Sequence, residues 1–60
     1  MYNKIYAEEA FDMASKGCTE AEIAEALNIS WDTFLYWKRT HIDFLVMIKN
    51  GKDYYRDSMN

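Results

Sequence analysis

The residues best equipped to bind a ligand lie between Ser30 and Arg39, in the run SWDTFLYWKR. A guanidinium such as that of Arg39 can pair with guanine or with phosphate, and Lys38 beside it can also bind phosphate. The hydroxyl groups of Ser30 and Tyr36 can donate hydrogen bonds to phosphate oxygens. These residue types favour contact with nucleic acid, although Lys38 and Arg39 could instead form a solvated helix end that suits the helix dipole.

Apolar and acidic side chains share the same run. Leu35 or Trp31 could meet thymine methyl groups, whereas phosphate would repel Asp32 unless that carboxylate caps a helix or accepts a hydrogen bond from a cytosine amine. Trp31 could equally pack at a helix corner, and Leu35 and Tyr36 could pack in the core or against another subunit. The predicted DNA-binding residues are Ser30, Trp31, Asp32, Thr33, Leu35, Tyr36, Lys38 and Arg39.

Two helix start signals precede and position these side chains. In the run TEAE, Thr19 and Glu22 match a capping box, which predicts a helix over about residues 20–27. Ser30 is a second N-cap residue, so the next helix is expected over about residues 31–39. The predicted contact residues therefore lie on the second of two closely spaced helices.

The turn between these helices has the pattern of a helix-turn-helix. Ala24 supplies the small residue needed where the two helices approach, and Asn28 occupies a turn position that requires a residue tolerant of positive φ. Phe34 and Trp37 complete an apolar corner, which turns the predicted contact residues outward. An αα-hairpin that never touches nucleic acid is the alternative interpretation.

Two further helices are expected, over about residues 5–16 and 43–57, with Gly17 ending the first. Gly51 either ends the last helix or lies inside it, and we favour continuation because lysines and aromatic residues recur beyond it. The expected apolar stripe of the first helix comprises Tyr6, Ala10, Met13 and Ala14. The fold class predicted is all-α, a single helix-turn-helix domain of about four helices spanning residues 1–60.

The last predicted helix also carries a row of charges. Lys49, Lys52 and Arg56 recur at helical spacing, with Asp53 and Asp57 close by. We interpret this row as a solvated face whose charges pair with one another.

Composition and charge limit the classes of function that we expect for this chain. The chain has 60 residues, a formal net charge of −3 and one cysteine. Acidic residues dominate the first half and most cations lie in the second, so an anion-binding surface must come from the second half. We expect no enzyme, because no nucleophile with a nearby base, glycine-rich phosphate loop or paired-carboxylate pocket is evident. No cofactor or metal is expected, since Cys18 and His41 lack partners at ligand spacing.

The same features predict weak binding to DNA. One copy would make about two to four phosphate contacts, so its affinity should be low and sensitive to salt. Useful binding would then require several copies, because multivalency raises avidity without new contacts. The chain lacks an apolar run long enough for a membrane span, and its single cysteine suits a reducing compartment, so we expect no membrane partner and a cytosolic location.

The run from Ala14 to Gly51 resembles the N-terminal helix-turn-helix domain of bacteriophage terminase small subunits. The resemblance is carried by KGCTEAEIAEALNIS, by TFLYWK, and by HIDF followed by a short helix ending in KNGK. It implies a non-enzymatic subunit that binds viral packaging-site DNA, assembles as a ring, and regulates the terminase large subunit in the cytoplasm of the bacterial host. The sequence departs from the family pattern in two ways: Ile42 replaces a frequent proline, and Leu35 and Tyr36 lie where a basic residue is frequent.

Two other interpretations stay open. Related helix-turn-helix spacing occurs in transposases and transcriptional regulators, and helix-turn-helix geometry alone does not set the biological role. In the other interpretation, from a different functional class, the apolar outer face of the 31–39 helix binds protein rather than DNA.

Overall fold

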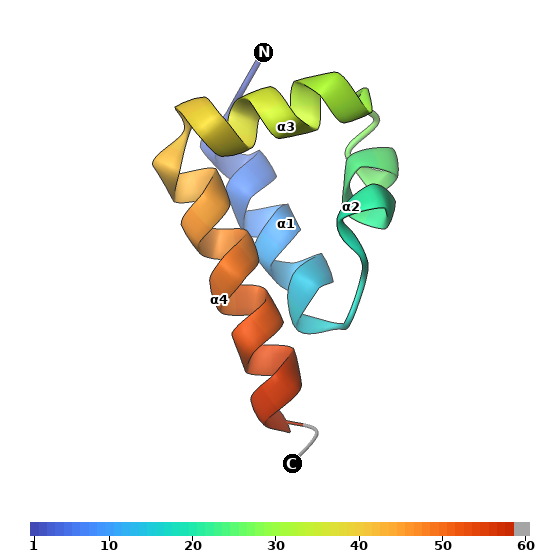
Figure 1. The fold of residues 1–60 in the computed structure, drawn as a ribbon, viewed down its shortest axis with the longest axis vertical. Coiled ribbons are helices and arrows are strands. Elements are labelled where there is room, and N and C mark those ends of the chain that lie inside the picture. The colour runs from blue at the N-terminus through green and yellow to red at the C-terminus, as the bar shows by residue number, and fades with distance from the viewer. Residues whose placement is uncertain (59–60) are drawn as a thin grey trace.

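The computed structural model describes residues 1–58, and these residues form four α-helices (Figure 1). The helices are α1 (Lys4–Ser15), α2 (Glu20–Ala26), α3 (Trp31–Thr40) and α4 (Ile42–Ser58). The all-α prediction is confirmed, and each helix end lies within one residue of its predicted position. Among the described residues, no helix has the length and apolar character needed to cross a membrane.

Local side-chain chemistry explains where α2 and α3 begin. The Thr19 hydroxyl accepts a hydrogen bond from the Glu22 N–H at 3.2 Å, and the Glu22 carboxylate accepts one from the Thr19 N–H at 2.8 Å. At the start of α3, the Ser30 hydroxyl accepts from the Thr33 N–H at 3.1 Å. The predicted capping box and second N-cap are therefore confirmed.

The turns use residues that tolerate a left-handed backbone. Gly17, which follows α1, has a φ of +93°, and Asn28, between α2 and α3, has a φ of +60°. Positive φ is uncommon outside glycine, and asparagine is one of the few residue types that adopt it at low cost. Both turn predictions are confirmed, and the Asn28 turn directs the chain from α2 into α3.

α1 and α4 run side by side (Figure 1), and small residues allow them to approach closely. Ala7, Ala10 and Ala14 are buried on α1, and the buried Gly51 of α4 lies against Ala14. A Cβ atom at Gly51 would lie 2.7 Å from the Ala14 Cβ and 2.8 Å from the Phe11 carbonyl oxygen. No side chain fits at this contact without a shift of its neighbours. α4 continues through Gly51 to Ser58, so the predicted continuation of the last helix is confirmed.

α3 lies across one end of the α1–α4 pair (Figure 1), where aromatic side chains hold it. The buried rings of Phe34 and Trp37 meet Phe44 of α4 edge-on, with centroid distances of 5.5 and 5.8 Å. Tyr2 contacts Trp37 edge-on at 5.2 Å, and its hydroxyl donates a hydrogen bond to the Asp43 carboxylate at 2.6 Å. That hydrogen bond lowers the pKa of Asp43, whereas burial, together with the same bond, raises the pKa of Tyr2. The face of α3 opposite Phe34 and Trp37 is exposed to solvent.

Candidate nucleic-acid interface

The outer face of α3 carries most of the side chains predicted to be available for contacts. Phe34 and Trp37 point into the core, and helical geometry turns the opposite side of α3 to solvent. The exposed residues are Ser30, Trp31, Asp32, Leu35, Tyr36 and Arg39, whereas Thr33 and Lys38 are half-buried. The division of α3 into an inward and an outward face is confirmed, while contact with DNA stays a prediction.

The polar groups at the start of α3 are already engaged in holding the helix. Besides accepting from the Thr33 N–H, the Ser30 hydroxyl donates to the Thr33 hydroxyl at 2.9 Å. Asp32 is not the cap, but it lies in the first turn, where the helix dipole favours a negative charge. A phosphate approaching this end would meet an exposed carboxylate and a serine whose proton is already donated. The start of α3 therefore suits phosphate less well than its end.

Trp31 combines the two roles that the sequence left open. Its ring stacks on the buried Phe34 ring, with a centroid distance of 5.2 Å and an interplanar angle of 13°. The residue nevertheless stays 47% exposed. One face of the indole thus packs on the corner of the domain, and the remainder is available to a ligand.

Leu35 and Tyr36 do not pack in the core of this chain. Leu35 is 39% exposed and Tyr36 is 58% exposed. Core packing, one of the alternatives for these two residues, is therefore wrong within the described chain. Both present apolar surface beside Trp31 on the outside of α3, which leaves contact with DNA or with another protein.

Lys38 is tied to α2 by an ion pair. Its ammonium lies 3.0 Å from both carboxylate oxygens of Glu20, and Lys52 of α4 lies 2.6 Å from one of them. Burial opposes the charge on Glu20, but the hydrogen bonds and charges of Lys52 and Lys38 outweigh it and lower the pKa of this carboxyl. Lys38 is consequently less available to phosphate than its position in the sequence implied.

One cation of α4 pairs as expected and another does not. Arg56 pairs with Asp53 at 2.8 Å, as the charge row of α4 predicted, but Lys52 pairs across the molecule with Glu20. The self-paired interpretation is thus wrong for Lys52. Arg39 is exposed and forms no ion pair with any carboxylate of residues 1–58. Arg39 is therefore the α3 cation best placed to meet a phosphate or a guanine.

The two residues considered for metal binding have contacts of another kind. Cys18 is half-buried and packs against the core. The His41 ring lies flat on the Tyr2 ring, with a centroid distance of 3.8 Å and an interplanar angle of 8°. In the part of the chain that the structure describes, no cluster of three or more His, Cys, Asp or Glu side chains could hold a metal ion.

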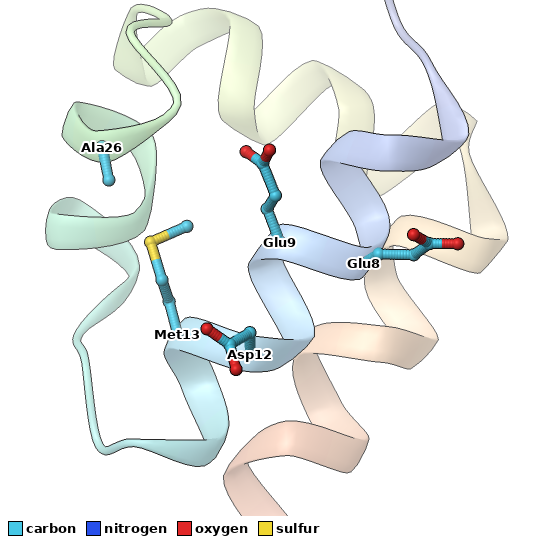
Figure 2. Close-up of a pocket in the computed structure, with 5 residues that line it drawn as sticks. All are labelled: Glu8, Glu9, Asp12, Met13 and Ala26. Carbon is cyan, nitrogen blue, oxygen red and sulfur yellow. The ribbon is translucent and has the colours of Figure 1, made fainter.

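A groove between α1 and α2 is a second surface, which the sequence analysis did not identify (Figure 2). Its volume is about 410 Å³, and it is lined by Glu8, Glu9, Asp12, Met13 and Ala26. Met13 extends from α1 towards Ala26 of α2, while the acidic side chains stand along α1 (Figure 2). The spacing of the acidic residues was visible in the sequence, but the placement of α2 beside them is a tertiary feature.

No protein-family model, curated protein or solved structure matches this chain. The case for a function therefore rests on the capped helices, on the turn between them and on the side chains that α3 exposes. Its strongest elements are the positive φ of Asn28 and the unpaired guanidinium of Arg39 on the outer face, within residues 1–58.

Proposed function

We propose that this chain is a DNA-binding module of the helix-turn-helix type, in which α3 enters the major groove. The observation that carries the proposal is a tight turn at Asn28 between two N-capped helices, with the outer face of the second helix left exposed. In this arrangement Arg39 contacts guanine or phosphate, and Trp31 and Leu35 approach thymine methyl groups.

On the resemblance to bacteriophage terminase small subunits, we further propose a biological role. The module recognises viral packaging-site DNA as part of an oligomeric ring and regulates the large packaging subunit, in the cytoplasm of a bacterial host. The ion pair between Lys38 and Glu20 supports a low affinity per copy, because it neutralises one of the few cations on α3. Several copies on one DNA would restore the affinity.

A protein partner for the same face is the second candidate function. The observation that favours it is the exposed apolar surface of Trp31, Leu35 and Tyr36, since apolar patches on a small domain often mark protein interfaces. In this alternative, α3 is covered by protein and is closed to DNA.

NMR titration of the ¹⁵N-labelled chain with a short DNA duplex, at low and then moderate salt, separates the two candidates. DNA binding predicts salt-sensitive shift changes confined to residues 30–41 that Arg39→Ala reduces. Lys16→Ala is the matched control, because it also removes one exposed cation but follows the C-terminal end of α1, which points away from α3 (Figure 1).

If the Arg39 guanidinium pairs with guanine, Arg39→Ala is expected to cost about 1–3 kcal/mol of binding free energy. If it pairs with phosphate, the variant should instead show a weaker dependence of the affinity on salt. Absence of any shift change at millimolar DNA would remove the DNA-binding proposal for this domain. Concentration-dependent changes at Trp31, Leu35 and Tyr36 without DNA would instead favour the protein interface.

A further inference from the structure

Two hollows that share Glu9 lie along α1, and none of the predicted DNA-contact residues lines either of them. The first is the groove of Figure 2, lined by α1 and by Ala26 of α2. The second, of about 310 Å³, is lined by Met1, Asn3, Ile5, Tyr6 and Glu9. Glu9 lines both hollows, so together they follow one face of α1 from its first turn to Met13.

The chemistry of this face alternates along the helix axis. Ile5, Glu9 and Met13 are spaced at four residues, which places them on one side of α1 over about 12 Å. Apolar surface therefore lies at both ends, from Ile5 and Tyr6 at one and from Met13 and Ala26 at the other. A carboxylate lies midway between the two apolar ends.

Two of the three acidic side chains of the groove have no ion-pair partner among the residues that the structure describes. Asp12 pairs with Lys16 at 3.0 Å, but neither Glu8 nor Glu9 forms an ion pair with any cation of residues 1–58. A ligand that matches this surface must therefore bring a positive charge between two apolar groups. DNA would be repelled here, and a simple polyamine would leave the apolar ends empty.

We propose that these two hollows together dock a basic amphipathic helix from a protein partner. Two apolar side chains of that helix, two turns apart, sit at Ile5 and Tyr6 and at Met13 and Ala26. A lysine or arginine between them faces Glu9, with Glu8 on the rim. This is the helix-in-groove mode of recognition, in which apolar anchors supply affinity and the charge sets orientation and specificity. It goes beyond the proposed DNA binding and uses none of the α3 residues.

The test is an NMR titration of the ¹⁵N-labelled chain with a synthetic stapled helix. The probe peptide carries two leucines two turns apart and one lysine midway between them, and a control peptide carries glutamate in place of the lysine. The lysine peptide is expected to shift Ile5, Glu9, Met13 and Ala26 and to leave the outer-face residues Leu35, Tyr36 and Arg39 unchanged. Glu9→Gln should weaken its binding about two- to fivefold, the range of an exposed ion pair.

Matched variants keep the result unambiguous. Asp57→Asn removes the same charge from an exposed site at the far end of α4, and it should leave the affinity unchanged. Ile5→Ser removes one apolar anchor from an exposed position in the first turn of α1, and circular dichroism verifies that the fold is kept. Equal binding of both peptides, equal weakening by Asp57→Asn and Glu9→Gln, or no shifts at these four residues would each overturn the proposal.

Discussion

Glu20 connects three helices through its carboxylate. It begins α2, and it receives hydrogen bonds from Lys38 of α3 and from Lys52 of α4. The side chains of Glu20 and Lys38 are each only 23% exposed, so water screens this pair less than a fully exposed one. The cluster therefore helps to hold α2, α3 and α4 together while it keeps the Lys38 ammonium paired with α2.

Glu20→Gln is expected to destabilise the fold by about 0.5–1 kcal/mol at neutral pH, since a partly exposed ion pair contributes at the upper end of the surface range. The folded pKa of Glu20 lies below its ordinary value of 4.5, so this contribution is complete above that value. It is lost as the pH falls through the folded pKa. Urea unfolding of the wild type and of Glu20→Gln between pH 7 and pH 3 should show that the difference between their free energies of unfolding becomes smaller at acid pH.

Glu25→Gln is the control for the loss of one carboxylate, because Glu25 is exposed and lies outside the cluster. It should change the free energy of unfolding at neutral pH by less than about 0.5 kcal/mol. A Glu20→Gln protein as stable as the wild type at neutral pH would show that the cluster adds nothing to stability.

The close packing of α1 against α4 depends on small residues where the two helices touch. The sequence placed Tyr6 and Met13 on the apolar stripe of α1, but both are only partly buried, and Ala7 is buried instead. With alanines on α1 and Gly51 on α4, the helix backbones come close enough to exclude a Cβ atom. Packing density between two helices, rather than apolar character alone, selects these residues.

Gly51→Ala is expected to destabilise the fold despite alanine being the better helix former. The gain in helix propensity is about 1 kcal/mol, whereas overpacking of a filled contact costs about 1–3 kcal/mol. Because one clashing atom is the Phe11 backbone oxygen, which cannot rotate away, we expect a cost in the upper part of that range and a net loss of about 1–2 kcal/mol in unfolding free energy.

Asn50→Ala serves as the comparison in the same denaturation experiment. Asn50 is exposed next to Gly51, so alanine there gains helix propensity without a clash and should stabilise slightly. An unchanged or higher stability of Gly51→Ala would mean that α1 and α4 can separate at little cost.

At the scale of the whole molecule, α3 and the C-terminal end of α4 lie at opposite ends of the long axis (Figure 1). The described chain measures 36 × 20 × 17 Å, with α3 across one end and the C-terminal end of α4 at the other (Figure 1). A tether attached beyond α4 would therefore leave the outer face of α3 free. This arrangement suits a module that acts in several copies on one DNA.

A C-terminal fusion to a short coiled-coil dimer should accordingly bind a long DNA duplex about 100-fold or more tightly than the single chain does. Fluorescence anisotropy at several salt concentrations would measure the affinity and a steeper salt dependence, because more phosphates are contacted. The same fusion carrying Arg39→Ala is the control and should lose most of the gain. A fusion that binds no better than the single chain would count against the multivalent role.

Much of the local structure could be predicted because its causes lie within a few residues of one another. Thr19 with Glu22, Ser30 with Thr33, and the backbone of Asn28 each form their capping or turn geometry over four residues or fewer. The inward turn of Phe34 and Trp37 follows from helical periodicity once α3 begins at Trp31.

The sequence by itself thus determined four helices, their ends, the turn between α2 and α3, and the outward face of α3. Only the tertiary structure decided that Lys38 and Lys52 share Glu20, that Gly51 meets Ala14, and that α2 forms a groove with α1. The physical reason is the range of the interactions. Caps and periodicity act along neighbouring residues, whereas ion pairs, close helix contacts and grooves depend on how separate helices are placed in space.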